Sequence, residues 1–469
     1  MISKNFFNIR NKEFSLIQKA KHPIKIILSD KNSFEKLKSS MAKNILNWVN
    51  FNSYESLVGS ILCLPDNNFK IKNIYAGIGK KFSLWDIACI IKKLPFGEYE
   101  IECNENNLKK YAIAWSLESY KFNYFSNKIY NKKNKKNLIL TSKVSNAITP
   151  VVDGCYLARD LINLPPNILN PNKLEEIIVS LAKQHKAKLS IIKHKNLIRN
   201  YPLVHFVGRA SEYEPRVLDL KWGDSEKLPL ITLIGKGVTF DSGGLDLKPP
   251  KGMELMKKDM GGAAVAIGLG HAIMSSNLNI NLRIILPIVE NAVSDKSMRP
   301  SDIIKSAAGI NVEIGNTDAE GRLILADSLY HATVSNKSNL IIDFATLTGA
   351  ARIALGTELP AIFSNNNSIS KKITQIGKNE EDPLWELPLH EHYNSYLDLE
   401  NGQLSNIGST AYGGAITAAL FLSRFIQNKT NWVHIDLMGW NLISKPGRPK
   451  GGEAMTLRTI YEFLSKEYS

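Results

Sequence analysis

LITLIGKGVTFDSGGLDLKPP, residues 230–250, is the stretch that decides the fold. Its first five residues form an unbroken β-prone run that ends at Gly235, as expected of a strand buried on both faces of a parallel sheet. The glycines that follow permit a tight backbone path, and Lys236, Asp241 and Lys248 lie among them. Ligands of open α/β sheets collect beyond the carboxyl ends of the strands, so this loop is a candidate site.

Apolar runs and helical patterns alternate on both sides of this strand. Strand-like runs lie at residues 189–194, 283–289, 340–344 and 433–437, and helical spacing is found at residues 173–185, 262–275, 322–334 and 415–426. This alternation predicts a largely parallel sheet covered by helices. The sequence is therefore typical of the α/β class.

The length of 469 residues favours two domains. The N-terminal part contains apolar segments such as IKIILSD (24–30) and SLVGSILCL (56–64), which fit a small α/β unit without a chemical motif. The polar run NKKNKKN (131–137) indicates an exposed loop or the start of a linker. We expect domains at 1–145 and 146–469, each a mostly parallel or mixed sheet flanked by helices, with the larger domain C-terminal.

The composition predicts a soluble protein. The apolar share of 44% and the charged share of 22% are close to globular averages, and no apolar run is long enough to cross a bilayer. The first residues lack a secretory signal, which predicts a cytoplasmic location. Four cysteines show no CxxC pair or metal-ligand spacing, so we expect reduced thiols without a functional role.

The net charge of +15 is concentrated in the N-terminal third. Residues 1–150 hold 25 Lys and Arg against 11 Asp and Glu, whereas the remainder holds 34 against 33. This imbalance indicates either a solvated, lysine-rich surface or an acidic partner such as nucleic acid.

Two further segments carry carboxylates at the start of predicted helices. Asp259 lies in MELMKKDMGGAA (253–264), and Asp318, Glu320 and Arg322 lie in NTDAEGRLILADSL (316–329). Each has an ordinary alternative: Asp259 is a favoured helix cap, and Thr317 with Glu320 fits the capping-box pattern. Helix capping does not explain why Asp318 and Arg322 also lie in this turn.

The combination of three segments favours a metal site. Carboxylates that converge in one crevice repel one another unless cations neutralise them, and carboxylate bridges hold two metals roughly 3.5–4 Å apart. A phosphate loop is excluded because Phe240 stands where GxGxxG needs its third glycine. The sequence contains no HExxH helix and no GxSxG elbow, so a histidine-bound zinc protease and a serine hydrolase are disfavoured. Oxygen donors suit Mn²⁺ or Mg²⁺ as well as Zn²⁺.

At this point the sequence resembles the cytosolic leucine aminopeptidases, which are di-metal exopeptidases. NTDAEGRL (316–323) reproduces the signature of that family, and GKGVTFDSGG, DMGGAA, ATLTGA (345–350) and GGAITAALFL (413–422) match its other blocks in order. The resemblance extends from about Ala147 to the C-terminus, whereas residues 1–145 match only in position and size, as a macro-like domain. One departure is GGEAMTL (451–457), where many members show a GATG-like turn.

The resemblance implies a role for each polar residue. One metal would be bound by Lys236, Asp241, Asp259 and Glu320, and the other by Asp241, Asp318 and Glu320. A lysine ligand must be deprotonated, which a neighbouring dication favours. Catalysis would use Lys248, for the oxyanion, and Arg322. A bicarbonate would be held by Arg322 with Ala319, Gly321 and Leu347, and the apolar pocket for the N-terminal side chain would include Met256, Thr346 and Gly349.

The implied reaction is attack of a metal-bridging water on the first peptide bond, with the free α-amine of the substrate at the metals. The implied cofactors are two divalent ions per subunit, Mn²⁺ or Zn²⁺ with Mg²⁺ as an alternative, and bicarbonate. The implied assembly is a homohexamer that acts on peptides, with no membrane contact. Two alternatives remain: a nucleic-acid-binding regulator that uses the basic N-terminal region, and a catalytically inactive homologue, which the intact set of seven polar residues disfavours.

Overall fold

The computed structural model describes residues 14–125, 135–334 and 338–468, and these form two compact units. The smaller unit contains residues up to Val152 together with Ile443–Lys450, and the larger unit contains Asp153–Leu442 and the chain from Gly451 onward. The described helices include none that is long and apolar enough to cross a membrane.

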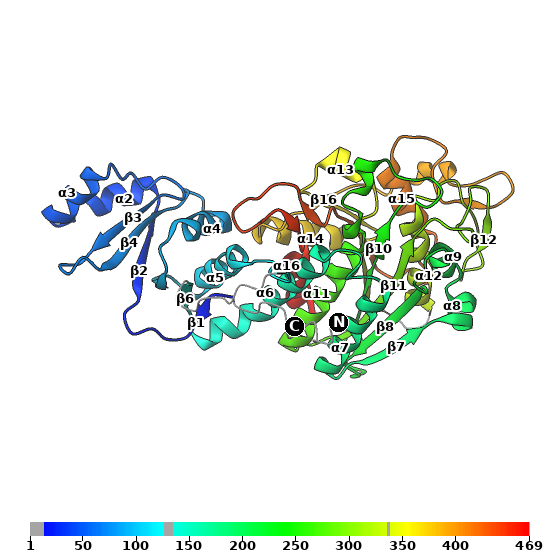
Figure 1. Cartoon of the computed structure of the whole chain (residues 1–469), viewed down its shortest axis with the longest axis horizontal. Helices are drawn as coiled ribbons and strands as arrows, with labels where there is room; N and C mark the ends of the chain where they lie inside the picture. The colour runs from blue at the N-terminus through cyan, green and yellow to red at the C-terminus, as the bar shows by residue number, and fades with distance from the viewer. Residues whose placement is uncertain (1–13, 126–134, 335–337, 469) are drawn as a thin grey trace. The chain divides into compact units, whose positions relative to one another are not determined.

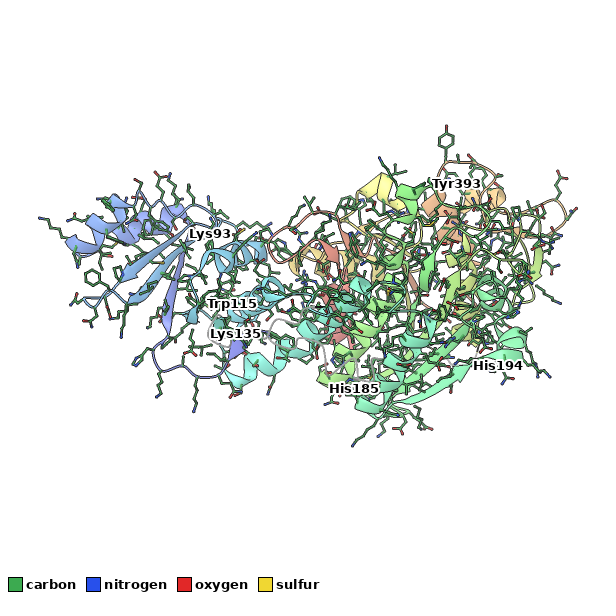
Figure 2. All side chains as sticks on the ribbon, viewed as in Figure 1. Lys93, Trp115, Lys135, His185, His194 and Tyr393 are labelled. Atoms are coloured by element: carbon green, nitrogen blue, oxygen red, sulfur yellow. The ribbon has the colours of Figure 1, made fainter. Side chains whose placement is uncertain are left out.

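The smaller unit is built on a six-stranded sheet with the order β1-β6-β5-β2-β4-β3 among the described residues. Its strands are β1 (Leu16–Ile17), β2 (Ile24–Ser29), β3 (Ile61–Pro65), β4 (Ile71–Gly77), β5 (Gly97–Ile101) and β6 (Lys136–Ile139), and its helices are α2 (Lys31–Lys38), α3 (Lys43–Phe51), α4 (Leu84–Lys93) and α5 (Glu105–Ser119). All the strand pairs are parallel except β3 with β4. Trp115 of α5, labelled in Figure 2, is fully buried and donates a hydrogen bond to the Lys136 carbonyl oxygen (2.9 Å).

The larger unit contains a nine-stranded mixed sheet in the described residues, with the order β16-β15-β18-β14-β9-β11-β8-β7 and with β10 paired to β11. The strands are β7 (Lys188–Ile192), β8 (Arg216–Trp222), β9 (Leu230–Gly235), β10 (Gly237–Asp241), β11 (Asn281–Asn291), β14 (Leu340–Ala345), β15 (Ala361–Ser364), β16 (Trp385–Glu386) and β18 (Trp432–Asp436). Neighbouring pairs in the centre, from β11 through β9 and β14 to β18, are parallel. All residues of β14 and β18 are buried, as expected of strands covered on both faces.

Short elements and helices complete the larger unit (Figure 1). The helices are α6 (Ser142–Asn163), which belongs to this unit from Asp153 onward, α7 (Pro171–His185), α8 (His194–Asn200), α9 (Pro202–Gly208), α10 (Pro250–Met253), η1 (Met256–Met260), α11 (Gly261–Ser276), α12 (Glu320–Val334), α13 (Gly349–Leu355), α14 (Asn367–Asn379), η2 (Glu391–Tyr396), α15 (Gly414–Ser423) and α16 (Leu457–Tyr468). Small strands are β12 (Ile303–Lys305), β13 (Asn311–Glu313), β17 (Leu404–Ser405), β19 (Trp440–Asn441) and β20 (Gly451–Gly452).

Helices α11 and α12 pack on opposite faces of the central strands (Figure 1). Ile234 of β9 belongs to the core that contains α12, whereas the next residue, Gly235, approaches Ala263 of α11 so closely that a Cβ would lie 2.5 Å from its Cα. Successive residues of a strand point to opposite faces, so glycine at 235 lets α11 approach the sheet. Both helices therefore begin at the same edge of the sheet, beside the carboxyl ends of the parallel strands.

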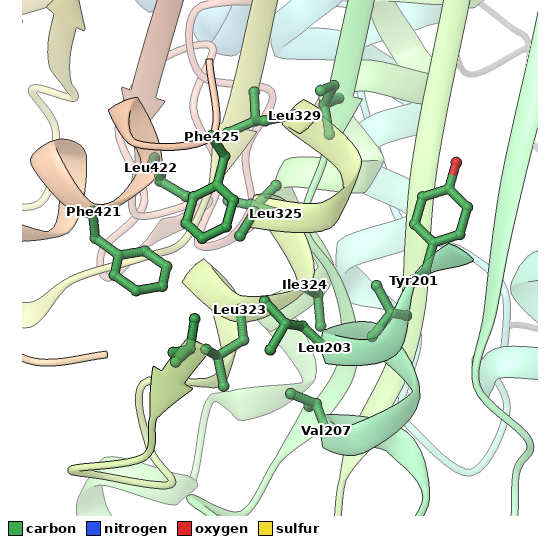
Figure 3. Packing of buried hydrophobic residues seen from close by; sticks show 14 of the residues in the cluster. Tyr201, Leu203, Val207, Leu323, Ile324, Leu325, Leu329, Phe421, Leu422 and Phe425 are labelled. Atoms are coloured by element: carbon green, nitrogen blue, oxygen red, sulfur yellow. The ribbon is translucent and has the colours of Figure 1, made fainter. Parts of the chain in front are cut away.

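The apolar core fixes α12 in place (Figure 3). Leu323, Ile324, Leu325 and Leu329 of α12 are fully buried against Leu203 and Val207 of α9, against Phe421 and Leu422 of α15, and against Phe425, which follows α15. Burial of each large apolar side chain contributes about 1.5–3 kcal/mol. The first turn of α12, which carries the predicted site residues, is therefore held by a rigid core.

Most predicted elements of the larger unit are confirmed, and two details differ. Residues 237–241, expected as part of a loop, form strand β10, because they pair with β11. Lys136 and Asn137, expected in a loop or linker, begin strand β6, while residues 131–134 lie outside the described residues. The division between the units falls within α6, at Val152 and Asp153, and residue 145 lies in the first turn of the same helix.

Candidate metal centre and active site

The three predicted segments meet at one cavity of about 360 Å³ in the larger unit. Eleven of the predicted site residues line it: Lys236, Asp241, Lys248, Met256, Asp259, Asp318, Ala319, Arg322, Thr346, Leu347 and Gly349. The remaining two, Glu320 and Gly321, lie immediately behind Lys236. Segments that are far apart in the sequence are thus brought together at the carboxyl edge of the sheet.

Each polar side chain is placed by the end of a regular element. Lys236 follows β9, and its backbone N–H donates to the Phe344 carbonyl oxygen of β14 (3.0 Å). Asp241 is the last residue of β10, Asp259 lies on η1 just before α11, and Glu320 is the first residue of α12. Strand ends and helix starts anchored in the core are more rigid positions for ligands than a free loop.

Lys236 lies between two buried carboxylates. Its Nζ is 2.8 Å from Asp259 Oδ2 and 2.8 Å from Glu320 Oε1, and all three side chains are at most 3% exposed. Asp241, Asp259 and Glu320 each offer an oxygen within 4.8 Å of the others. The centre of the site is therefore a compact cluster of three acids around one lysine.

Lys248 lies beside a second pair of carboxylates. Its Nζ is 3.0 Å from Asp241 Oδ2 and 2.5 Å from Asp318 Oδ1. Asp241 is thus shared between the two halves of the site. It also accepts hydrogen bonds from Asn291 Nδ2 (2.8 Å) and from the Gly243 backbone N–H (2.9 Å).

Gly321 makes room for Lys236. A Cβ at position 321 would lie 2.6 Å from Lys236 Cε and 2.7 Å from its Nζ. These separations are shorter than van der Waals contact, so residue 321 must be glycine for the lysine to occupy its place between Asp259 and Glu320.

The capping alternatives are not what the structure shows. Asp259 Oδ1 accepts from the Thr346 hydroxyl (2.7 Å), and α11 has no side-chain cap. The Thr317 hydroxyl donates to the Gly243 carbonyl oxygen (2.6 Å) and accepts from the Asp246 backbone N–H (2.8 Å). Thr317 therefore ties the 316–322 turn to the glycine-rich segment.

The site favours bound positive charge. Burial and the neighbouring Asp241 raise the pKa of Glu320 well above its ordinary value, and the same causes raise the pKa of Asp318 to about 6. Burial opposes the charge of Lys236, but Asp259 and Glu320 outweigh it, so the pKa of Lys236 is raised. The carboxylates thus hold protons or cations more strongly than isolated acids do.

The donor set fits divalent cations. Asp259 Oδ2, Asp318 Oδ1 and both carboxylate oxygens of Glu320 are buried and accept no hydrogen bond of good geometry from the described residues. Three of these oxygens lie within ion-pair distance of a lysine nitrogen, but distance alone does not satisfy their lone pairs. Buried, unsatisfied carboxylate oxygens in one cluster are the ligands that hard or borderline divalent ions prefer.

Comparison with known proteins assigns the family. Residues 156–461 match the family described as the cytosol aminopeptidase family, catalytic domain, and residues 23–140 match the M17 aminopeptidase N-terminal domain. The chain belongs to the cytosol aminopeptidase family. Membership makes it a hydrolase and a metal-dependent aminopeptidase that acts on peptides. The N-terminal match extends into a region where the sequence blocks alone give no motif.

Named relatives cover nearly the whole chain. A probable cytosol aminopeptidase of Rhodopseudomonas palustris is 34% identical over 428 residues, which cover 88% of this chain and 84% of that protein. The crystal structure of the cytosol aminopeptidase from Coxiella burnetii matches with a TM-score of 0.91 and 39% identity, covering 97% of this chain and all of that one. The bottromycin maturation enzyme BotP in complex with Mn matches with a TM-score of 0.85 but 24% identity, so it supports the fold alone.

Arg322 and the backbone N–H of Leu347, two groups predicted to bind an anion, contact different partners. Arg322 is buried, and its Nη1 donates to the Asn406 carbonyl oxygen (2.8 Å) while its Nε has no partner among the described residues. Burial lowers the pKa of Arg322 to about 10. The backbone N–H of Leu347 donates to Asp436 Oδ1 (2.9 Å) and that of Ala319 to the Asn316 carbonyl oxygen (3.3 Å), so the role of both groups in binding bicarbonate stays a prediction.

The cavity also contains residues that no sequence motif indicated. Lys258 and Arg352 line it beside Met256, Thr346 and Gly349. Burial lowers the pKa of Lys258 to about 8, and the Arg352 charge acts in the same direction. Both residues lie next to motif residues, but their own types matched nothing in the resemblance.

The GGEAMTL segment is absent from the lining residues of the cavity. Glu453 of this segment instead binds the buried Arg159 of α6, with Nε to Oε1 at 3.1 Å and Nη2 to Oε2 at 3.1 Å. The segment that departs from the GATG-like turn thus contributes Glu453 to an internal ion pair of the larger unit.

Proposed function

We propose that this protein is a two-metal aminopeptidase that removes leucine and other apolar residues from the N-termini of peptides. One metal would be held by Lys236, Asp241, Asp259 and Glu320, and the second by Asp241, Asp318 and Glu320. The observation that carries the proposal is the cluster of Asp241, Asp259 and Glu320, whose ligand oxygens lie within 4.8 Å of one another and are buried. Cations are the ordinary means of neutralising such a cluster.

Two bound divalent cations would polarise the scissile carbonyl and lower the pKa of the attacking water. The residues of the chain would do the rest. Asp241 and Glu320, central in the cluster, would bridge the two ions. Lys236 would give up its proton to serve as a ligand, and the carboxylates around it would keep the cations at fixed positions.

Lys248 and Arg322 would act on the reacting groups. Lys248 reaches the cavity from the loop after β10, where its ammonium could stabilise negative charge that develops on the carbonyl oxygen. Arg322, with the backbone N–H groups of Ala319 and Gly321 at the start of α12, would hold a bicarbonate that transfers the proton. Met256, Thr346 and Gly349 would receive the N-terminal side chain.

The native ions in this proposal are Mn²⁺ or Zn²⁺, with Mg²⁺ as an alternative, because carboxylate oxygens dominate the donor set. A cytoplasmic location is supported by the word cytosol in the names of the relatives. The hexamer stays a prediction from the resemblance, which light scattering of the metal-loaded protein would test.

The test is an assay of leucyl-p-nitroanilide hydrolysis with Mn²⁺, Zn²⁺ or chelator, paired with calorimetric metal titration. Glu320→Gln should lose metal binding and activity together. Lys248→Ala should keep metal binding and lose turnover by on the order of 100-fold, the usual cost of one oxyanion contact. Glu226→Gln, an exposed carboxylate outside the cavity, is the matched control and should behave as wild type.

Proton release gives a readout that does not depend on turnover. Because Lys236 is protonated beside two carboxylates, metal binding should release protons, and titration in buffers of different ionisation enthalpy would count them. Stoichiometric metal binding without proton release would contradict Lys236 as a ligand. Full activity of either Glu320→Gln or Lys248→Ala would contradict the assigned roles.

The nucleic-acid alternative for the basic residues 1–150 stays a prediction. Phosphate contacts weaken steeply as salt rises, because counterions are released on binding. A gel shift with the full chain at low and high salt tests it, and no shift at low salt would remove it.

A further inference from the structure

Two cations in the cavity have no role in the proposed chemistry. Lys258 lies on η1, directly before Asp259, and Arg352 lies on α13, whose first residue is Gly349. Both line the cavity together with Met256 and Thr346. They therefore lie on the wall of the proposed side-chain pocket, and Lys258 directly precedes Asp259 of the acid cluster.

Neither cation has an ion-pair or hydrogen-bond partner among the described residues, unlike the other three cations of the cavity. Lys236 and Lys248 contact carboxylates, and Arg322 donates to a carbonyl oxygen. Lys258 is only 2% exposed as a residue, and its ammonium has no carboxylate within ion-pair distance among the described residues. A buried, unpaired charge beside a second charge of the same sign is costly unless an anion compensates it.

The nearby carboxylates are already bonded to other groups. Asp259 contacts Lys236 and accepts from the Thr346 hydroxyl. Asp436 accepts from the backbone N–H groups of Leu347 and Thr348 and from the Thr348 hydroxyl (2.6 Å). Their charge is largely directed to those donors, so an external anion remains the best partner for the pair Lys258 and Arg352.

The position of the Arg352 guanidinium defines where that anion would bind. A Cβ placed on Gly349 would have Arg352 Nη2 as its nearest atom, at 3.8 Å. Gly349 and Met256 are two of the residues proposed to receive the N-terminal side chain. Lys258 and Arg352 line the same cavity as these residues, so a group that lies against Gly349 would be near a cation.

We infer that Lys258 and Arg352 form a carboxylate-binding subsite, which extends the substrate range of the proposed aminopeptidase to peptides with an acidic group next to the first peptide bond. The inference rests on the proposed function. The carboxylate comes from one of two sources: the side chain of an N-terminal Glu or Asp, or the free C-terminus of a dipeptide. Arginine and lysine together suit a carboxylate, which guanidinium groups bind with paired hydrogen bonds.

The experiment compares ratios of kcat/KM, so that general damage to the metal centre cancels. Glutamyl-p-nitroanilide against leucyl-p-nitroanilide tests the side-chain source, and Leu-Gly against Leu-Gly amide tests the C-terminal source. Lys258→Met and Arg352→Met should each lower at least one acid-to-neutral ratio by on the order of tenfold, the value of one charged hydrogen bond. Arg352→Glu should reverse that preference and favour lysyl-p-nitroanilide or a dipeptide amide.

Lys257→Met is the matched control, because it removes a neighbouring positive charge of η1 that is absent from the cavity lining. Lys257 Nζ donates to the Asn163 carbonyl oxygen (2.9 Å) instead. Its ratios should stay within twofold of wild type. Both ratios unchanged in Lys258→Met and Arg352→Met would overturn the inference, and a change in one ratio alone would assign the source of the carboxylate.

Binding of the products separates failure of this inference from failure of the proposed function. Calorimetry with L-glutamate, L-glutamine and L-leucyl-glycine needs no turnover. If no arylamide is hydrolysed with Mn²⁺ or Zn²⁺, the proposed function fails, while weaker binding of L-glutamate or the dipeptide to Arg352→Met would still support the subsite. Arg352 is half-buried on a short helix, so this variant keeps the test open if Lys258→Met does not fold.

Discussion

Replacing Gly321 with alanine tests whether Lys236 must occupy its observed position. In an ordinary helix, Gly→Ala stabilises by about 0.5–1 kcal/mol, because alanine is the better helix former. Here the new Cβ would lie 2.6 Å from Lys236 Cε, in a side chain that is 3% exposed and flanked by Asp259 and Glu320. Overpacking of a buried site costs about 1–3 kcal/mol, so the clash should outweigh the gain in helix propensity.

The expected result is a net loss of about 0.5–2 kcal/mol in the free energy of unfolding of the larger unit, with weaker metal binding. Denaturant unfolding of the chelated protein measures the first, and calorimetric metal titration measures the second. Gly252→Ala in α10 is the control: its Cβ would meet nothing closer than 3.5 Å, so this variant should be as stable as wild type or more so. A Gly321→Ala protein that is stabilised and binds metal normally would refute the placement of Lys236.

Three other perturbations follow from single contacts. Asn291→Ala removes the 2.8 Å hydrogen bond to Asp241. Because such supporting contacts orient metal ligands, the metal affinity measured by calorimetric titration should fall about 10- to 100-fold. An unchanged affinity would contradict this role of Asn291. Burial raises the pKa of Asp327 to about 7 in the folded protein, whereas its pKa in the unfolded chain is near 4. Protonated Asp327 therefore contributes folding stability that is fully present below about pH 4 and is lost as pH rises through about 7. Both Asp327 oxygens accept backbone N–H groups, from Ala307 and Leu203, so Asp327→Asn loses one of these bonds and should be less stable than wild type at low pH. Its deficit in thermal melts should shrink as pH rises from about 4 to about 7, and a deficit independent of pH would contradict the assignment. Glu453→Ala removes the carboxylate that contacts the buried Arg159 (3.0 Å) and should cost about 1.5–3 kcal/mol in denaturant unfolding, the usual value of a hydrogen bond to a charged group; a loss below about 0.5 kcal/mol would contradict this contribution.

The elements that could be predicted are those whose pattern is local. The run 340–344 is apolar except at Asp343 and became the fully buried strand β14, and the helical spacing of 322–334 became α12. Strand β10 was missed because its glycines and charges resemble a loop, and only pairing with β11 makes it a strand. The local sequence of β10 does not indicate a pairing partner that lies 50 residues away, such as Val289 for Thr239.

The candidate site shows the same limit. The three segments could be singled out from their carboxylates, but the capping alternatives for Asp259 and Thr317 are decided by tertiary partners, Thr346 and Gly243. Lys258 and Arg352 carried no signal, because a lysine beside a motif and an arginine in a helix are ordinary surface residues. Their shared cavity became visible only when the fold brought η1 and α13 together.

The contacts of Lys248 connect metal binding to catalysis. Its ammonium lies between Asp241 Oδ2 and Asp318 Oδ1, two oxygens proposed to hold the second metal. A lysine and a dication compete for the same carboxylates, so binding of the metal should release Lys248 from both oxygens and leave its charge for the substrate. Removing the lysine removes the competitor, so Lys248→Ala should bind the second metal at least as tightly as wild type while it loses turnover. Weaker binding of that metal by Lys248→Ala would mean that the lysine supports the metal site directly. This result would contradict the hypothesis that the metal displaces Lys248 from Asp241 and Asp318.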